Sequence, residues 1–470
     1  MAKAKIICTM GPSCNTVEMV EGLIDSGMNV ARINFSHGNH DEYRLMISAI
    51  REAAAKKQEP IAILGDLCGP KIRIGELDKP VIDLETGGSI VITTRNIIGN
   101  ADRVSTTYPN LVTDVEKGNR ILLDDGNIEL SVTDVSSDEV RCEIVIGGVL
   151  KPNKGMNLPG IHVSAPAISA KDLCDIEFAV REGVDLLALS FVRTPDDVKK
   201  AKKIVANFGS DIPIIAKIEK EEAVRAFESI HDEADGIMIA RGDLGVEMAS
   251  EQVPLIQKRI IRACNETAKP VITATQMLES MTYHPNATRA ETSDVANAII
   301  DGSDAVMLSG ETAVGKYPLK TVETMKRIID GVEGELRKGR RVEDWFSRES
   351  TIENAVTAAA CRAAELLDAR AIVAYTQSGS TAMRLSQQRP RTPILALSPC
   401  EGIRRRLSLF WGVRSILVEQ VPDTESMVDT AERIVRENGY AQRDNIIVIT
   451  SGTPLGVAGT TNLMNIYKIK

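Results

Sequence analysis

Pro213-Ile-Ile-Ala-Lys-Ile-Glu219 is an apolar run rich in β-branched residues that closes with a lysine and a glutamate two positions apart. In an extended strand, side chains at positions i and i+2 point to the same face, roughly 6 to 7 Å apart. The run therefore predicts a buried strand whose Lys217 and Glu219 share one space. A cation beside a carboxylate that can hold a metal suits chemistry on an anion. An exposed ion pair on an edge strand is the simpler interpretation of this run taken alone.

The same alternation of apolar run and helical pattern repeats on both sides of this strand. Further strands are expected at 5–8, 29–34, 61–66, 186–191, 236–240, 270–274 and 305–308, with helices at 17–26, 40–57, 171–182 and 195–207 among others. Eight parallel strands with helices between them predict a (β/α)8, or TIM, barrel, in which the working residues lie where the strands end.

Polar side chains stand at nearly every predicted strand end. They are Arg32 and Asn34, Asp66, Ser190, Lys217 and Glu219, Arg241 and Asp243, Thr273 and Thr275, and Ser309 and Glu311. Some of these residues would be helix caps or loop positions in any barrel. We assign about half of them to that role, and a helix cap suits Ser190 and Ser309. Capping does not explain a lysine, an arginine and two carboxylates around one barrel mouth.

Residues 70–168 change to the period of two that is typical of strands. The expected strands, 81–84, 89–94, 120–123, 129–133 and 140–146, are separated by Gly, Asn and Asp turns. Because this all-β insertion leaves the barrel at its mouth, we expect a β-barrel lid that closes over the site and excludes water. A passive insertion is the alternative. The basic turn Asn153-Lys-Gly-Met-Asn-Leu-Pro-Gly160 near the return hinge favours the lid.

The last part of the chain begins a second α/β pattern, which predicts a C-terminal three-layer α/β regulatory domain. The predicted domains are the barrel (1–69 and 169–344), the lid (70–168) and the C-terminal domain (345–470). In the last domain, Thr376-Gln-Ser-Gly-Ser-Thr-Ala382 lies between a strand and a helix. Backbone N–H groups and hydroxyls at a helix start can hold a phosphate, here with Thr376, Ser378, Ser380 and Thr381. An ordinary hydroxyl-rich turn explains the same letters.

Composition limits the class of protein. A chain of 470 residues with 43% hydrophobic content predicts a soluble protein of about two to four domains. A net charge of -9 argues against general binding of nucleic acid or membrane surfaces. Eight scattered cysteines without a CxxC pair fit a reducing cytoplasm. Five histidines without paired spacing make zinc a poor expectation and a hard cation held by oxygens a better one.

Several segments, in their joint order, resemble the pyruvate kinase family over essentially the whole chain. They are Ala31-Arg-Ile-Asn-Phe-Ser-His-Gly38, Gly69-Pro-Lys-Ile-Arg73, Lys217-Ile-Glu219, Ala240-Arg-Gly-Asp-Leu-Gly-Val-Glu247, Ile272-Thr-Ala-Thr-Gln-Met-Leu278, Thr288-Arg-Ala-Glu291, Asp294-Val-Ala-Asn-Ala298 and Val306-Met-Leu-Ser-Gly-Glu311. The resemblance implies phosphoryl transfer from phosphoenolpyruvate to ADP, giving pyruvate and ATP in the last step of glycolysis. It also implies a homotetramer and a phosphorylated allosteric effector.

The resemblance assigns roles to single residues. Glu219 and Asp243 match the positions that bind Mg2+ or Mn2+, and Lys217 would neutralise charge on the transferring phosphoryl group and the enolate oxygen. The other expected roles are Arg32 for the phosphoryl oxygens, the backbone of Gly242 and Asp243 for the substrate carboxylate, Thr275 beside the enolate carbon, and Arg73 and Lys154 for the nucleotide.

One segment departs from the pattern of members that require a monovalent cation. Those members read Asp-Thr-Lys-Gly-Pro-Glu, and this chain reads Asp66-Leu-Cys-Gly-Pro-Lys71. Asn34, Ser36 and Asp66, which match K+ ligands, are kept. Leu67 and Lys71 are similar to the choices of the family's K+-independent branch, although Cys68 is unusual even there. We expect the Lys71 ammonium to supply the charge that K+ otherwise provides, so that K+ is not required; an exposed hinge lysine is the alternative.

Two other classes of protein remain open. A metal-dependent barrel lyase or aldolase acting on an enolpyruvate-type intermediate could use the same pair of carboxylates, and ADP-dependent formation of pyruvate would decide between them. A non-catalytic sensor could bind metabolites through the 376–382 turn. The joint presence of Lys217, Glu219, Asp243 and Thr275 argues against the sensor.

Overall fold

The computed structural model describes residues 2–339, 350–457 and 459–470. The central body is a closed barrel of eight strands in the order β1-β16-β15-β14-β13-β12-β3-β2, and all neighbouring strands are parallel. The predicted TIM barrel is thereby confirmed. Its strands are β1 (Lys5–Thr9), β2 (Val30–Asn34), β3 (Ala62–Asp66), β12 (Leu186–Leu189), β13 (Ile214–Ile218), β14 (Gly236–Ala240), β15 (Val271–Ala274) and β16 (Ala305–Leu308).

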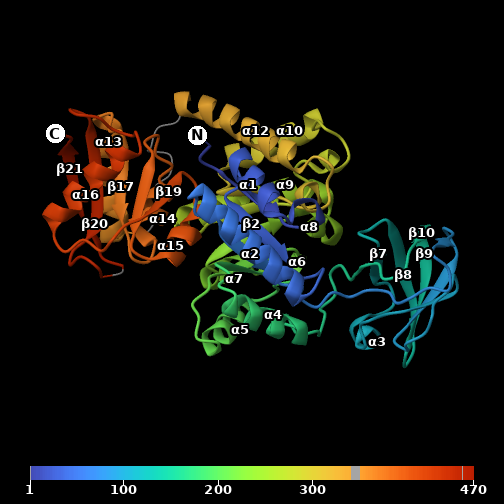
Figure 1. The fold of residues 1–470 in the computed structure, drawn as a ribbon. Coiled ribbons are helices and arrows are strands. Elements are labelled where there is room, and N and C mark those ends of the chain that lie inside the picture. Colours follow the sequence, from blue (N-terminus) through green and yellow to red (C-terminus); the bar gives the residue numbers. More distant parts are fainter. Residues whose placement is uncertain (1, 340–349, 458) are drawn as a thin grey trace.

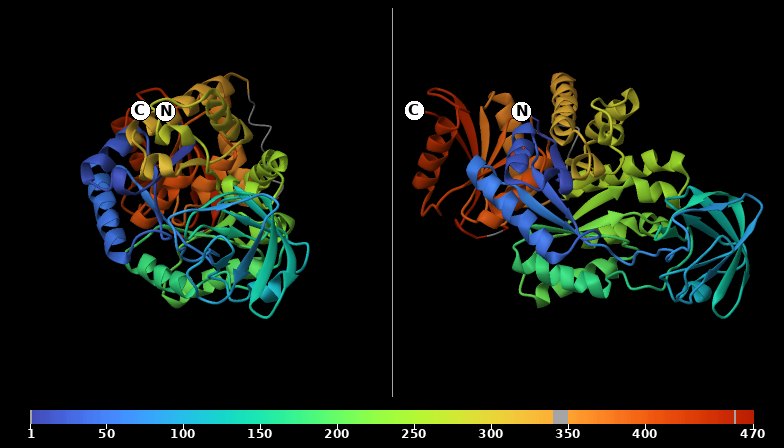
Figure 2. Two further views of the ribbon diagram at one scale, coloured as in Figure 1. Left: turned by 90° about the vertical axis from the view of Figure 1, so that its right-hand side faces the viewer. Right: turned by 45° about the vertical axis from the view of Figure 1, so that its right-hand side comes forward.

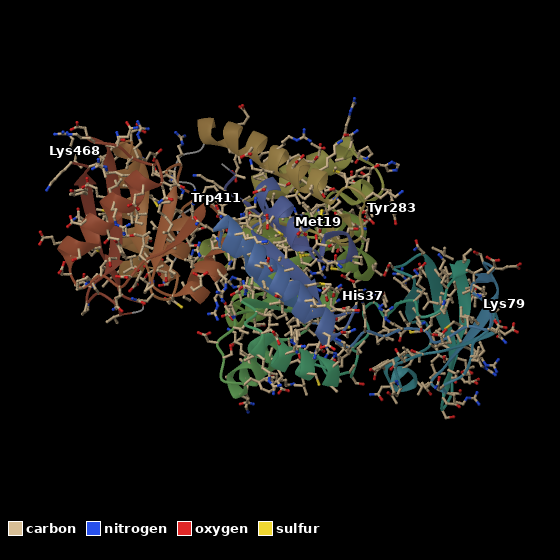
Figure 3. All side chains as sticks on the ribbon, viewed as in Figure 1. Met19, His37, Lys79, Tyr283, Trp411 and Lys468 are labelled. Carbon is tan, nitrogen blue, oxygen red and sulfur yellow. The ribbon has the colours of Figure 1, made fainter. Side chains whose placement is uncertain are left out.

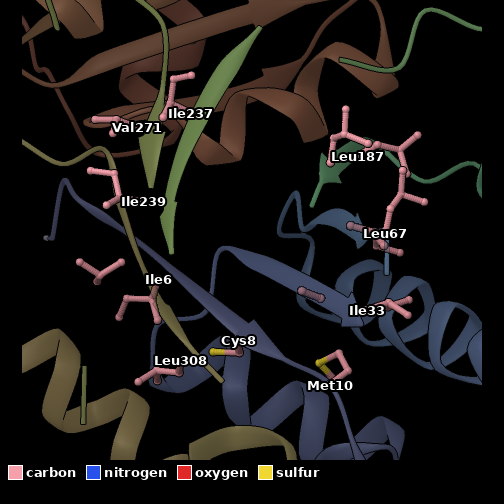
Figure 4. Packing of buried hydrophobic residues seen from close by; sticks show 14 of the residues in the cluster. Ile6, Cys8, Met10, Ile33, Leu67, Leu187, Ile237, Ile239, Val271 and Leu308 are labelled. Atoms are coloured by element: carbon pink, nitrogen blue, oxygen red, sulfur yellow. The ribbon is translucent and has the colours of Figure 1, made fainter. Parts of the chain in front are cut away.

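Helices surround the barrel because the strands are apolar on both faces. Ile7 packs into the barrel interior. Its neighbours Ile6 and Cys8 belong to the layer between strands and helices (Figure 4). The helices are α1 (Val17–Ser26), α2 (His40–Lys57), α4 (Ala170–Arg181), α5 (Pro195–Asn207), α6 (Glu221–Arg225), α7 (Phe227–Glu233), α8 (Arg241–Glu247), α9 (Val253–Thr267), α10 (Arg289–Asp301), α11 (Gly310–Ala313) and α12 (Pro318–Gly339). Of these, α8 is the short helix that directly follows β14.

An all-β domain is inserted between β3 and α4, and it extends from one end of the barrel (Figure 1). Its elements are β4 (Ile82–Leu84), β5 (Ser89–Thr93), β6 (Arg103–Ser105), α3 (Leu111–Asp114), β7 (Arg120–Leu123), β8 (Ile128–Val135), β9 (Glu139–Ile146), β10 (Gly148–Leu150) and β11 (Met156–Asn157). They form a six-stranded sheet, β11-β7-β8-β9-β5-β6, and a separate pair, β10-β4, rather than the one closed barrel that we expected. The short strands β6, β10 and β11 were not predicted, because two or three residues carry too little periodicity.

The C-terminal domain is a five-stranded sheet in the order β19-β18-β17-β20-β21 with helices on both faces. Its elements are α13 (Ile352–Leu366), β17 (Ala371–Tyr375), α14 (Ser380–Gln387), β18 (Ile394–Ser398), α15 (Glu401–Arg406), β19 (Val413–Leu417), α16 (Thr424–Glu437), β20 (Ile446–Gly452) and β21 (Thr461–Lys468). The antiparallel edge strand β21 was missed by the sequence analysis, although its burial alternates as expected for an edge. The expected domain boundary at 344/345 lies outside the described residues.

The two smaller domains occupy opposite ends of the barrel (Figure 2). The inserted domain follows the carboxyl end of β3, whereas the C-terminal domain contacts the ends where strands begin. There, Arg389 pairs with Asp304 at 2.8 Å and the Lys5 ammonium donates to the carbonyl oxygen of Val413 at 2.7 Å. Trp411 lies in this interface (Figure 3). Among the described helices, none is both long and apolar enough to cross a membrane.

Candidate active site

A cavity of about 520 Å³ opens at the carboxyl end of the barrel strands. It collects most of the predicted strand-end residues from six of the eight strands and the loops after them. Its polar lining consists of Arg32, Asn34, Ser36, Asp66, Cys68, Lys71, Ser190, Lys217, Glu219, Asp243 and Thr275. The barrel closure therefore brings together residues that are more than two hundred positions apart in the chain.

Lys217 is the most constrained cation in the cavity. Its Nζ lies 2.8 Å from Glu219 Oε1 and 3.2 Å from Asp66 Oδ1, and it donates to Ser190 Oγ at 2.7 Å. The side chain is 12% exposed. Burial lowers the pKa of Lys217, but Asp66 and Glu219 outweigh burial and raise it above its ordinary value. Lys217 is therefore a fixed ammonium at neutral pH.

Asp66 holds a second cation beside the first. Its Oδ2 accepts from Arg32 Nε and Nη2, both at 2.7 Å, while Arg32 Nη1 donates to Thr9 Oγ1 at 2.9 Å. Burial raises the pKa of Asp66, but Lys217 and Arg32 together lower it below the usual value. One buried carboxylate thus orients two cations toward the same space. Thr9 was missed because the first strand was predicted to end one residue earlier.

Glu219 and Asp243 are the acidic pair of the cavity. Glu219 is 1% exposed, and its Oε2 accepts the backbone N–H of Phe191 at 2.8 Å. Burial, with the Glu219 charge as the next cause, raises the pKa of Asp243 to about 6. Two carboxylates buried close together are unfavourable without a cation, and Mg2+ is commonly held by one or two carboxylates plus substrate oxygens and water. This pair fits such an ion. Among the described residues, no cluster of three or more His, Cys, Asp and Glu could hold a metal by itself.

Thr275 and Gly242 are bonded to each other in this structure. Thr275 Oγ1 accepts the N–H of Gly242 at 2.7 Å and donates to the carbonyl oxygen of Ala274 at 2.6 Å. Gly242 is the second residue of α8, and its amide was expected to bind the substrate carboxylate. A carboxylate at this helix start therefore has to displace or share the Thr275 hydroxyl.

The predicted monovalent-cation residues divide between the cavity and the core. Asn34, Ser36, Asp66 and Lys71 line the cavity, and Asn34 Oδ1 accepts the N–H of Ser36 at 3.1 Å. The side chain of Leu67 is instead buried in the layer between strands and helices (Figure 4), so only its backbone carbonyl could serve as a ligand. The Lys71 side chain is exposed at the cavity edge, close enough to lower the pKa of Asp243 together with Lys217.

Arg73 and Lys154 lie at the base of the inserted domain on adjacent segments, outside the cavity lining. Arg73 Nη1 donates to the carbonyl oxygen of Asn153 at 2.7 Å, and Lys154 pairs with Asp124 at 2.7 Å. Both cations are occupied by protein oxygens. An incoming nucleotide phosphate would have to compete with these contacts.

Ser190 and Cys68 also belong to the cavity. A helix cap was the interpretation that suited Ser190, but its hydroxyl accepts a hydrogen bond from Lys217, which corrects that interpretation. The signal was present, since Ser190 stands at a predicted strand end. Glu311 is also at a predicted strand end, but it does not line the cavity. Its buried carboxylate accepts hydrogen bonds from the backbone N–H groups of Leu278 and Ser309.

The hydroxyl-rich turn of the C-terminal domain borders a separate cavity of about 520 Å³. Thr376, Ser378, Ser380 and Thr381 all line it. Thr376 Oγ1 accepts the N–H of Gly379, and the Thr381 hydroxyl is bonded to that of Thr461. The described residues around this cavity include no lysine or arginine. A phosphate there would depend on hydroxyls and backbone N–H groups.

Comparisons with known proteins agree with this geometry. A family model for the barrel domain of pyruvate kinase matches residues 1–322, and one for its alpha/beta domain matches residues 354–467. The pyruvate kinase of Staphylococcus aureus strain MRSA252 is 45% identical over 472 residues, which span 100% of this chain and 81% of that protein. The enzyme of strain USA300 is 44% identical with the same coverage. A crystal structure of a pyruvate kinase from Cryptosporidium parvum matches with a TM-score of 0.94 and 36% identity, covering 100% of this chain and 96% of that chain.

Fold and site together define a TIM-barrel phosphotransferase with a charged cavity for an anionic substrate at the carboxyl end of its strands. The chain belongs to the pyruvate kinase family. Its reaction is the transfer of a phosphoryl group from phosphoenolpyruvate to ADP, and the family generally uses Mg2+. This assignment decides against the lyase, aldolase and sensor interpretations.

Proposed function

We propose that phosphoenolpyruvate binds in the cavity beside Lys217, and that this lysine is the catalytic cation. The observation that carries the proposal is the threefold fixation of the Lys217 ammonium by Asp66, Ser190 and Glu219 in a nearly buried position. Phosphoryl transfer needs positioning and charge neutralisation more than covalent catalysis. A preorganised ammonium meets that need without reorganising during the reaction.

The substrate would be held at both of its anionic ends. Arg32, oriented by Asp66, would bind the phosphoryl oxygens. The N–H groups of Gly242 and Asp243 would bind the carboxylate at the start of α8, and Thr275 would then face the enolate carbon. Lys217 between these ends would neutralise the phosphoryl group and the departing enolate oxygen.

Glu219 and Asp243 would hold the divalent ion, Mg2+ or Mn2+. When bound, such an ion supplies a positive charge that bridges substrate oxygens and stabilises the charge of the transferring group. The raised pKa of Asp243 supports this assignment, because burial first and the Glu219 charge second disfavour its carboxylate form, and a bound cation would offset both.

The nucleotide would bind where the inserted domain meets the barrel, with Arg73 and Lys154 on its phosphates. The inserted domain would act as a lid that closes over the cavity and excludes water. We retain residues 70–168 as its limits. Support comes from the bridge between Arg73 and Gly155, which puts both cations on adjacent segments at the base of this domain.

We further propose that Lys71 replaces the monovalent cation, as in the K+-independent branch of the family. Asn34, Ser36 and Asp66 line the same cavity as Lys71, and the field of Lys71 reaches Asp243. The shared cavity supports a role for the Lys71 ammonium in place of K+.

The family suggests three further properties for this chain. We propose a homotetramer, a phosphorylated effector bound at the 376–382 turn, and a cytoplasmic location. All eight cysteines are free, which supports a reducing compartment. None of the described residues that line the cavity at this turn is basic, so an effector phosphate there would accept hydrogen bonds from hydroxyls and backbone N–H groups.

A coupled assay of pyruvate formation tests both the reaction and the role of Lys71. With phosphoenolpyruvate, ADP and Mg2+, and only bulky organic cations as counterions, we expect full activity that K+ does not raise. Lys71→Glu should make activity depend on K+, because it restores the residue of K+-requiring members. Lys79→Glu, an exposed change on the inserted domain (Figure 3), is the control and should stay independent of K+. A wild-type rate that collapses without K+ would refute the role of Lys71, and no pyruvate under any of these conditions would refute the reaction itself.

A further inference from the structure

Two consecutive residues after β15 have left-handed backbone conformations. The φ angles are 67° at Thr275 and 54° at Gln276. Such angles are uncommon without glycine, and a β-branched residue such as threonine rarely adopts them. Backbone strain of this kind persists only where the surroundings hold the segment in place.

The side chain of Arg241 holds Thr275 and Gln276 in this conformation. Its Nη2 lies 2.8 Å from the carbonyl oxygen of Thr275 and 3.2 Å from that of Gln276, so one guanidinium group bridges both strained residues. Its Nη1 donates to Asp294 Oδ1 at 2.7 Å, from helix α10. The side chain is 11% exposed, and its Nε is buried without a hydrogen-bond partner. The guanidinium is therefore held in place by its contacts with the turn and with Asp294, and little of it is open to solvent.

The backbone that follows Arg241 contacts the same turn at a second point. Gly242 donates its N–H to Thr275 Oγ1, and a Cβ at position 242 would lie 3.4 Å from that oxygen. The first two residues of α8 therefore fix both the carbonyl and the hydroxyl of Thr275. The position of Thr275 and the start of α8 depend on each other.

We propose that Arg241 is a positioning residue for phosphoenolpyruvate. By bridging Thr275 and Gln276, it keeps the Thr275 hydroxyl and the amides at the start of α8 in the arrangement that receives the substrate carboxylate. Asp294 orients the guanidinium. The inference rests on the proposed roles of Thr275, Gly242 and Asp243. It predicts that loss of the bridge impairs the handling of phosphoenolpyruvate and not of ADP, whose proposed contacts lie at the base of the inserted domain.

The test is a steady-state comparison of two variants with a matched control. Arg241→Lys keeps the charge but cannot bridge two carbonyl oxygens and a carboxylate, because an ammonium lacks the planar fork of a guanidinium. Asp294→Asn keeps the side-chain size and weakens only the orientation. The control is Arg51→Lys at the other end of the barrel, where Arg51 bridges the carbonyl oxygens of Ile61 and Gly183 and pairs with Asp185.

We expect Arg241→Lys to raise the KM for phosphoenolpyruvate about tenfold while the KM for ADP stays unchanged. Asp294→Asn should raise the same KM by a smaller factor, and it keeps the proposal testable if Arg241→Lys does not fold. Arg51→Lys should lower the thermal unfolding midpoint without changing either KM.

The inference is overturned if Arg241→Lys and Asp294→Asn change both KM values equally or leave the KM for phosphoenolpyruvate unchanged. It is also overturned if Arg51→Lys reproduces the selective increase, since that would show a general effect on stability. Failure of the proposed reaction is a different result, because the wild-type protein would then form no pyruvate from phosphoenolpyruvate and ADP.

Discussion

Asp66 is the residue on which the charge arrangement of the cavity depends. It is 1% exposed and accepts hydrogen bonds from both Arg32 and Lys217. An unpaired buried carboxylate is costly, so Asp66 and its two cations stabilise one another. The result is a cavity in which two positive charges are held in place before any anion arrives.

Lys217→Met is the residue-scale test of this arrangement. We expect the chemical step to slow by several orders of magnitude, since a single preorganised charge can contribute ~10²-fold or more. Binding of Mg2+ and phosphoenolpyruvate should be largely retained, because Arg32, Glu219 and Asp243 remain. Single-turnover rates and equilibrium binding measure the two effects separately.

The matched control for that experiment is Lys202→Met. Lys202 pairs with Asp235 at 2.7 Å, near the start of β14 rather than its carboxyl end. This variant should keep the wild-type rate. Near-normal turnover in Lys217→Met would show that the ammonium has no catalytic role.

The segment that returns from the inserted domain to α4 limits how the inserted domain and the barrel can move relative to each other. Arg193, in the loop after β12, donates to the carbonyl oxygens of Val163 and Ala165, the second at 2.7 Å. On the other side, Ser164 donates its N–H to Asp114 of the inserted domain at 2.8 Å. One short segment is thus fastened to the barrel and to the inserted domain.

Arg193→Ala should loosen this connection. We expect faster proteolysis of residues 159–168 and a fall of about tenfold in kcat/KM for ADP, because the proposed nucleotide cations would be less well positioned. The thermal unfolding midpoint should change little. Arg181→Ala removes an exposed pair with Glu177 on α4 and is the control. Wild-type rates of proteolysis and catalysis in Arg193→Ala would exclude a hinge role for this arginine.

At the scale of the whole molecule, the C-terminal domain is joined to the barrel through buried charged groups. The Lys5 ammonium, at the start of β1, donates to Val413 in β19. Burial lowers the pKa of Lys5 from 10.5 to about 8, with Glu333 and Glu59 opposing the shift and Arg414 adding to it. Below pH 8 the folded protein carries the cost of burying this charge.

This interface predicts a pH dependence of stability. Between pH 8 and 10.5, the unfolded chain keeps a proton on Lys5 that the folded chain has lost. The Lys5 contribution to the free energy of unfolding therefore rises with pH through that window, by at most about 3 kcal/mol. Relative to Lys5→Met, the wild-type protein should become more stable as the pH rises, in denaturation measured on either side of pH 8.

Lys468→Met provides the comparison for that series, since Lys468 is an exposed lysine of the C-terminal domain that pairs with Asp444 (Figure 3). Its difference from the wild-type protein should not change with pH. A pH-independent difference for Lys5→Met as well would contradict the assigned titration.

Much of this protein could be predicted from the sequence alone. Alternating periods of strand and helix determined the barrel, and the i, i+2 spacing was enough to put Lys217 and Glu219 on one face. Short strands such as β11 were not predicted, because two or three residues are too few to show a periodic pattern. The edge strand β21 was missed because Thr461-Asn-Leu-Met-Asn-Ile-Tyr-Lys468 does not alternate apolar and polar residues; only its burial alternates.

The sequence by itself determined the fold class, the family and most of the polar residues that line the cavity at the barrel mouth. Only the tertiary structure decided which of them touch: that Ser190 holds Lys217, that Leu67 faces the core, and that Arg241 reaches the turn at Thr275. The physical reason is that periodicity specifies the face of an element on which a side chain lies. The partner across the barrel depends on closure, which joins strand ends from distant parts of the chain.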